Sequence, residues 1–366
     1  MDKTTRRSFL AGLAASTLTP APSWADAGSP AFLSAARLAQ DRYALCGMDA
    51  RGELLFQLPL PARGHAAAAH PNRPEVVGFA RRPGNFAYVI DCARGAVSAE
   101  LTAPEGYHFY GHGVFSQDAR RLYTTENDFE AARGMIGVWD VRAGYRRIGA
   151  FESGGIGPHE IARLPQTDTL VIANGGIETH PDAGRAKLNL ATMTPNLAYI
   201  SEAGRMLEQV SLPQGLHQHS IRHIDIAAAG PLSGAVAIGL QWQGDMAQVP
   251  PVVALHRRGG ALRLLDAGGQ VQRDAQGYVG SIAFDQNART IAATCPRGGF
   301  VLLFDPETGV LRDRIAAPDA CGVARHAGGI VLTSGTGRVS ALAARTGQTA
   351  LLAQHELSFD NHLVRL

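Results

Sequence analysis

Short hydrophobic runs separated by polar turns follow one another along the chain. In residues 110–126 a run opened by His112 is followed by a polar turn at 116–120 and a second run at 122–125. This alternation predicts two short antiparallel strands joined by a tight turn. The same pattern returns at 280–294, where residues 284–291 match residues 115–122 without a gap, and looser copies occur at 158–173 and 65–79.

The repetition indicates the fold class. A pair of amphipathic strands cannot bury its hydrophobic faces alone, so their recurrence favours sheets stacked against one another. We predict an all-β, seven-bladed β-propeller that forms a single domain over residues 30–366. Its blades are expected at 30–61, 65–103, 108–152, 157–212, 217–267, 278–317 and 320–366. The N-terminus of the mature chain is expected to complete the last blade and so close the ring.

The fourth predicted blade contains a long insertion at about 175–195. The segment joins predicted strands at 171–174 and 197–200, and it mixes charged residues with Leu188, Leu190 and Met193. A loop of this length in a compact repeat is usually either functional or disordered. Its apolar content argues against a mobile linker, and we predict an ordered flap on one face of the propeller.

The first 25 residues have the features of an export signal. Residues 5–10 (TRRSFL) contain a twin-arginine motif, a weakly apolar run follows at 11–18, and small residues surround a cleavage site at 23–25. The apolar run is much shorter than the ~20 residues that a membrane helix needs. We therefore predict that residues 1–25 are a twin-arginine signal peptide and that the mature chain is periplasmic, with no membrane span.

Removal of this segment changes the charge of the chain. It takes away three of the 34 basic residues and one of the 32 acidic residues, so the formal net charge of +2 falls to zero. A balanced chain gives no reason to expect nucleic acid or an anionic membrane as partner.

The four cysteines show no C-x-x-C spacing, which excludes the common zinc and haem-attachment motifs. Buried free thiols are the favoured interpretation, and a disulfide stays open.

Histidines provide the candidate chemistry. Of the 13 in the chain, four open the inner strands of predicted successive blades: His65, His112, His159 and His219. The inner strands of a propeller surround its central channel, so equivalent positions in neighbouring blades converge at one channel mouth. A ring of neutral imidazoles there suits a borderline transition metal such as iron, copper or zinc.

Three further residues belong to this predicted metal site. His217 lies two residues before His219, so the two side chains would share one face of a strand. Glu160 follows His159 directly and could add an oxygen ligand, and His362 lies close to the C-terminus. The alternative is that such histidines only form hydrogen bonds across a wet channel. No catalytic residue is identified, because the chain lacks G-x-S-x-G, H-E-x-x-H and phosphate-loop motifs.

Several separate motifs resemble one bacterial family, known as domain of unknown function 1513. They are 111–115 (GHGVF), 123–127 (YTTEN), 157–160 (GPHE), 173–177 (ANGGI), 179–182 (THPD), 187–190 (KLNL), 217–223 (HQHSIRH), 296–299 (PRGG) and 359–363 (FDNHL). The resemblance spans almost the whole mature chain and implies an exported seven-bladed propeller. It also implies an imelysin-like or haem-protein partner in the periplasm, because such proteins are encoded beside similar ones.

Three functional hypotheses follow. The leading one is a non-enzymatic periplasmic propeller that binds a transition metal, or a metal-bearing partner, at its histidine-rich channel mouth and assists iron or other metal uptake or redox chemistry. The second is a metal-dependent hydrolase of the lactonase type that uses the same site to activate water. The third is a protein-interaction scaffold with no small ligand.

Overall fold

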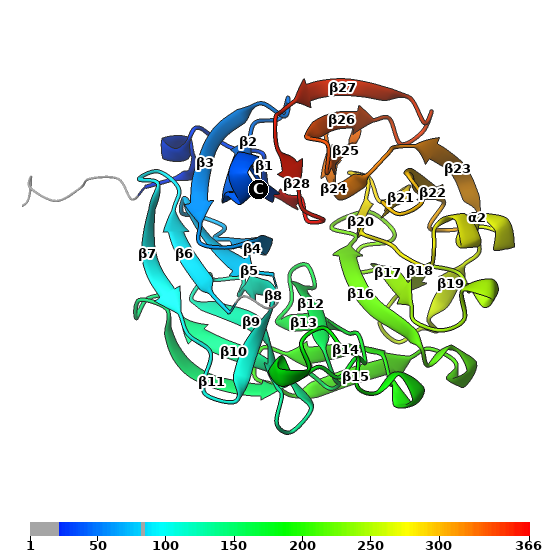
Figure 1. The fold of residues 1–366 in the computed structure, drawn as a ribbon, viewed down its shortest axis with the longest axis horizontal. Helices are drawn as coiled ribbons and strands as arrows, with labels where there is room; N and C mark the ends of the chain where they lie inside the picture. The colour runs from blue at the N-terminus through cyan, green and yellow to red at the C-terminus, as the bar shows by residue number, and fades with distance from the viewer. Residues whose placement is uncertain (1–21, 82–84) are drawn as a thin grey trace, which may run out of the picture.

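Seven antiparallel sheets stand around a central channel in the computed structural model, which describes residues 22–81 and 85–366 (Figure 1). The prediction of an all-β, seven-bladed propeller is confirmed. In six of the sheets the first strand lies against the channel and the last strand lies at the outer rim of the ring (Figure 1).

Six blades take all four strands from one continuous stretch of chain. From the channel outward, the first two are β4 (Gly64–Ala69), β5 (Glu75–Ala80), β6 (Ala87–Asp91) and β7 (Ala96–Leu101), then β8 (Tyr107–Phe115), β9 (Arg121–Asp128), β10 (Arg133–Asp140) and β11 (Arg146–Glu152). The next two are β12 (Pro158–Arg163), β13 (Thr169–Asn174), β14 (Asn196–Ser201) and β15 (Met206–Ser211), then β16 (His219–Ile226), β17 (Val236–Trp242), β18 (Val253–His256) and β19 (Arg263–Leu265). The last two are β20 (Ser281–Phe284), β21 (Ile291–Cys295), β22 (Phe300–Phe304) and β23 (Leu311–Ala316), then β24 (Ala320–His326), β25 (Gly329–Ser334), β26 (Arg338–Leu342) and β27 (Thr349–Gln354).

The remaining blade joins the two ends of the chain. Strands β28 (Ser358–Phe359) and β29 (Val364–Arg365) both pair with β1 (Phe32–Arg37), which is followed outward by β2 (Tyr43–Met48) and β3 (Leu54–Leu60). The expectation that the N-terminus completes the last blade was therefore wrong. Strands β24–β27 form a full sheet by themselves, and the C-terminal segment instead covers the inner edge of β1, which would otherwise be unpaired.

Burial explains why these segments form inner and outer strands. All six residues of β13 are buried, as its continuous apolar run demands, whereas β11 at the rim is mostly exposed. The hydrophobic core lies between adjacent blades, where for example Val171 of β13 packs in one cluster with Ile238 of β17. The four cysteines, Cys46, Cys92, Cys295 and Cys321, are buried free thiols.

Short helices occupy several connections. They are η1 (Trp24–Ala27), η2 (Ala39–Asp41), η3 (Pro181–Ala183), η4 (Leu190–Thr192), η5 (Gln214–Leu216), η6 (Met246–Gln248) and α2 (Gly269–Asp274). No helix in the described part of the chain is long and apolar enough to cross a membrane. Most of the expected signal peptide lies outside the described residues. Its last residues are described, and the indole of Trp24 donates a hydrogen bond to the carbonyl of His70 at 3.0 Å.

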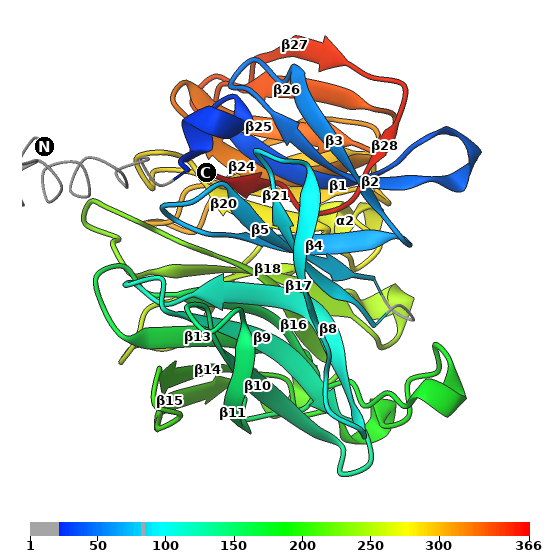
Figure 2. The same cartoon turned by 90° about the vertical axis from the view of Figure 1, so that its left-hand side faces the viewer.

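The insertion at 175–195 is held against the propeller by polar contacts. Asn127 of β9 donates to the carbonyl of Thr179 at 3.1 Å, and Gln218 donates to the carbonyl of Leu190 at 3.2 Å. Met193 is buried within it. The insertion and the β1–β2 hairpin project from the same face of the ring (Figure 2), so they border the same end of the channel.

Candidate metal site in the central channel

Irregular pairing places histidines on the channel axis. The register between the first and second strands is interrupted at His65 in β4, at His112 in β8 and at His159 in β12. Strand β16 has the same irregularity at Arg222, immediately before His223. A bulge leaves a residue without a cross-strand partner and re-aims its side chain. The unpaired residues include a histidine in β4, β8 and β12, whereas in β16 the unpaired residue is Arg222 and His223 follows it.

The result is a cluster of five imidazoles, contributed by four consecutive blades and by the loop between β28 and β29. The ring of His65 lies 4.5 Å from that of His362, 5.0 Å from His112 and 5.7 Å from His159, measured between centroids. His112 is 4.5 Å from His362 and 5.2 Å from His159. His223 is 4.8 Å from His159 and 5.1 Å from His362.

A carboxyl group joins the cluster. One oxygen of Glu160 lies 3.3 Å from Nδ1 of His223 and accepts a hydrogen bond from the backbone amide of Ile224 at 3.2 Å. Three overlapping sets of ligand atoms, each set within 4.8 Å, could hold a metal ion: His65, His112 and His362; His112, His159 and Glu160; Glu160, His223 and His362. We call these six residues the channel cluster.

Burial keeps the imidazoles neutral. It lowers the pKa of all five, and the positive charge of Arg222 lowers the pKa of His159 and His223 further. Four of their buried nitrogens have no hydrogen-bond partner among the described residues: Nδ1 of His65, Nε2 of His112, Nδ1 of His159 and Nε2 of His362. Such nitrogens are rare in native interiors, where buried polar atoms are normally paired.

The carboxyl of Glu160 is also held in its neutral form. Burial raises its pKa to about 8, and the nearby charge of Asp225 acts in the same direction, while the Ile224 amide only partly opposes the shift. At neutral pH the cluster is therefore a set of uncharged groups, as expected for ionisable residues in a low-dielectric interior.

Five of the seven residues predicted as ligands lie in the cluster: His65, His112, His159, His362 and Glu160. His219 opens β16 as expected, but it points away from the channel. Its Nε2 lies 2.7 Å from the carbonyl of Pro251, and its ring packs 5.5 Å from that of Trp242. His217 is half-buried and directly follows η5. His217 and His219 therefore lie outside the cluster, contrary to expectation. Strand β16 comes closest to the channel axis near its end, at His223, and not at its first residue.

His223 was missed in the sequence. Counting from the end of each inner strand would have found it. His65, His112, His159 and His223 each lie three or four residues before the last residue of their strands, which end at Ala69, Phe115, Arg163 and Ile226. His219 lies seven residues before the end of β16. Equivalent channel-facing positions are therefore found by counting back from the last residue of each inner strand, and not by counting forward from its first residue.

The cluster separates two cavities in the channel. The larger, of about 880 Å³, opens beside the 175–195 insertion and includes His65 and His159 in its wall. The smaller, of about 440 Å³, lies near the C-terminus and is lined by His112, Glu160 and His362. A small ion could therefore reach the channel cluster from either side. We call the larger cavity the mouth.

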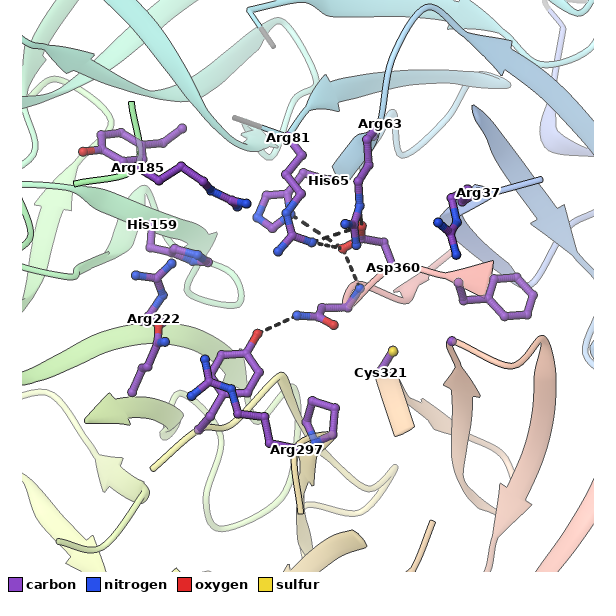
Figure 3. A pocket seen from close by; sticks show the side chains of 18 of the residues that line it. Arg37, Arg63, His65, Arg81, His159, Arg185, Arg222, Arg297, Cys321 and Asp360 are labelled. Atoms are coloured by element: carbon purple, nitrogen blue, oxygen red, sulfur yellow. Dashed lines mark hydrogen bonds and ion pairs between the residues drawn. The ribbon is translucent and has the colours of Figure 1, made fainter. Parts of the chain in front are cut away.

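Ion pairs to the buried carboxylate of Asp360 border the mouth side of the cluster. The carboxylate of Asp360 accepts a hydrogen bond from Nε of Arg63 at 2.8 Å and another from a terminal nitrogen of Arg81 at 3.1 Å (Figure 3). Nδ1 of His65 lies 3.9 Å from the same carboxylate. Burial alone would raise the pKa of Asp360, but His65, Arg81 and Arg63 outweigh it and lower the pKa well below its usual value. Asp360 thus stays ionised and orients His65.

Comparison with known proteins agrees with this architecture. Among solved structures, the chain is similar to Kuenenia stuttgartiensis hydrazine synthase, with a TM-score of 0.59 and 14% sequence identity over 85% of this chain and 88% of that one. At this identity the likeness concerns the fold alone. No curated protein matches the chain. The model of a family described as "Protein of unknown function (DUF1513)" matches residues 58–366. The chain therefore belongs to the DUF1513 family.

Proposed function

We propose that the propeller binds a transition-metal ion, iron, copper or zinc, at the channel cluster. The observation that carries this proposal is the set of buried, neutral imidazole nitrogens that face one another without hydrogen-bond partners among the described residues. A metal ion would satisfy those nitrogens, whereas a purely structural lining would leave them desolvated at a cost.

The donor set fits such a metal. Two of the three sets combine two imidazoles with one carboxylate, a combination found at zinc sites and at non-haem iron sites. The ligand atoms lie within 4.8 Å of one another, so bonds of about 2.0–2.1 Å to nitrogen require small rotations of the imidazoles. The hydrogen bond between Glu160 and the Ile224 amide would hold the carboxylate during that adjustment.

Elemental analysis of the purified protein tests the proposal. The protein should carry no polyhistidine tag, and wild type should be compared with a His112→Ala, His159→Ala variant. A His217→Ala, His326→Ala variant is the matched control, because it also removes two imidazoles, both outside the cluster. We expect close to one metal ion per chain in wild type and control, and almost none in the cluster variant. Equal metal content in all three proteins, whether high or near zero, contradicts the proposal.

A metal-dependent hydrolase is a second candidate, favoured by the position of the mouth. The mouth ends on His65 and His159, so a small ester or lactone could approach an ion held by the cluster. A bound ion would supply Lewis-acid polarisation and an activated water there. A panel of small esters and lactones, assayed with added metal, should then show turnover in wild type that is absent from the His112→Ala, His159→Ala variant.

We also propose that the protein works in the periplasm, beside an imelysin-like or haem-protein partner, in iron or other metal uptake or in redox chemistry. The support is the twin-arginine pattern of residues 5–10 and the family's setting. Fractionation of cells that produce wild type or an Arg6→Lys, Arg7→Lys variant tests the export step. The variant should accumulate in the cytoplasm, and an unchanged distribution argues against twin-arginine export.

A further inference from the structure

Positive charge is concentrated at one end of the channel. The described wall of the mouth contains two acidic side chains, Asp319 and Asp360, and seven basic ones: Arg37, Arg63, Arg81, Arg185, Lys187, Arg222 and Arg297. The smaller cavity on the other side of the cluster has a much smaller excess, because Arg325 and Arg365 face Asp225 there while Glu160 is neutral. The asymmetry shows that the excess belongs to the mouth and not to the channel as a whole.

The acidic residues of the mouth do not neutralise this charge. Asp360 is engaged by Arg63 and Arg81, which together carry more charge than it does. Arg37 lies 3.7 Å from Asp41, which is outside the wall, and Asp319 is the only other acidic side chain that the described wall itself contains. Lys187 shows the effect of this crowding, because burial and the neighbouring charges of Arg222 and Arg297 lower its pKa.

Aromatic and neutral polar groups line the mouth beside the basic side chains. The guanidinium of Arg297 lies over the ring of Tyr278, 4.5 Å from its centroid, and the hydroxyl of Tyr278 accepts a hydrogen bond from Asn361 at 2.7 Å. On the opposite wall the hydroxyl of Tyr110 lies 3.2 Å from that of Thr179 in the insertion. Arg185 and Lys187 belong to the same insertion, so it contributes two of the positive charges directly (Figure 3 shows Arg185, Arg222 and Arg297).

We propose that the mouth binds a small, multiply charged oxyanion whose carboxylate or phosphate groups face these guanidinium groups. Guanidinium forks match the geometry of both groups, and a concave site with one sign of charge concentrates the opposite ion. The cavity of about 880 Å³ encloses a small molecule. Because the charge lies inside a cavity and not along an exposed stripe, a small anion fits better than a nucleic acid strand. The proposal stands whether or not the cluster binds a metal.

Calorimetric titration of the metal-free protein with citrate, and separately with pyrophosphate, tests this site. The first probe carries carboxylates and the second phosphates, so the two titrations show which group the mouth prefers. The test variant is Arg185→Gln, Arg297→Gln, since both side chains are exposed and their replacement leaves the core intact. The control is Arg146→Gln, Arg345→Gln, which makes the same charge change on exposed residues outside the mouth.

We expect wild type and control to bind at least one probe with equal affinity and the mouth variant to bind it about tenfold or more weakly, since charge-assisted hydrogen bonds are the strong ones. A His112→Ala protein, altered on the far side of the cluster, should bind the anion as wild type does even if it no longer binds metal. Absence of binding by wild type to both probes at low salt, or equal weakening in the mouth and control variants, overturns the proposal.

Discussion

The roles of individual residues in the channel depend on their charged neighbours more than on residue type. Asp360 and Glu160 are both carboxyl groups beside histidines, yet their pKa values move in opposite directions. Asp360 meets two guanidinium groups and stays ionised, whereas Glu160 meets an amide and neutral imidazoles and holds its proton. The first is suited to orient His65, and the second is suited to exchange a proton for a metal ion.

Metal binding at neutral pH should release a proton from Glu160. Its pKa of about 8 in the metal-free protein means that the carboxyl is protonated at pH 7, while the imidazoles, with lowered pKa values, are already neutral. Titration calorimetry in buffers of different ionisation enthalpy should therefore show about one proton released per metal ion at pH 7. Glu160→Gln should bind metal more weakly, and no proton should be released. Equal proton release from both proteins contradicts this role for Glu160.

The same shift makes the stability of the metal-free protein depend on pH. The folded state keeps the Glu160 proton up to about pH 8, whereas an unfolded chain loses it near the ordinary value of 4.5. Glu160 therefore stabilises the fold less as the pH rises between these values. In Glu160→Gln this contribution is absent. Denaturant titrations at pH 5 and 8 should therefore show that its unfolding free energy changes less with pH than that of wild type. Identical profiles would show that the carboxyl is not protonated in the fold.

At the scale of elements, the blades could be predicted from the sequence but the bulges could not. The alternation of short apolar runs with polar turns outlined six blades, because each of them takes its strands from one continuous stretch of chain with local turns. The irregularities at His112 and Arg222 leave no signature in that alternation, so β8 begins at Tyr107, before the expected start, and His219 was assigned in place of His223. The pairing of β28 with β1 joins residues more than 300 positions apart, which local patterns do not encode.

The bulge in β8 depends on Gly111. Its backbone has a φ of +105°, and a Cβ atom there would lie 2.7 Å from Cδ2 of His65. Gly111→Ala should lower the free energy of unfolding by more than the roughly 1 kcal/mol of backbone strain alone and should also weaken metal binding. Gly144→Ala is the matched control, because its φ is +66° but nothing lies within 4 Å of the added methyl group. Denaturant titration and metal titration of both variants measure the two effects. Equal losses in the two variants would show that the contact with His65 is unimportant.

At the scale of the whole molecule, one short segment both closes the ring and supplies the cluster. Phe359 of β28 is 3% exposed and packs with Phe32 of β1, and the residues that follow it include Asp360 and His362. Closure of the propeller and assembly of the channel cluster are therefore coupled. Two of the three ligand sets include His362, so they are complete only when the two ends of the chain are paired.

Loss of the Phe359 side chain should loosen this closure. Phe359→Ala removes a fully packed ring and should cost about 3–5 kcal/mol of unfolding free energy, as large-to-small core changes do. Leu351→Ala, at a side chain that is 53% exposed in the outer strand β27, should change stability by less than about 0.5 kcal/mol. Thermal melts of the two variants compare these costs directly. Similar melting temperatures would mean that the ring is closed by other contacts.

The most direct test of the metal site is anomalous diffraction from crystals of the protein loaded with zinc, with data collected on both sides of the absorption edge. The account predicts a peak on the channel axis with bonds of about 2.0–2.1 Å to imidazole nitrogens of the channel cluster and with Glu160 beside it. Anomalous peaks only at histidines outside the cluster, such as His217, with none between His65, His112 and His159, would contradict it.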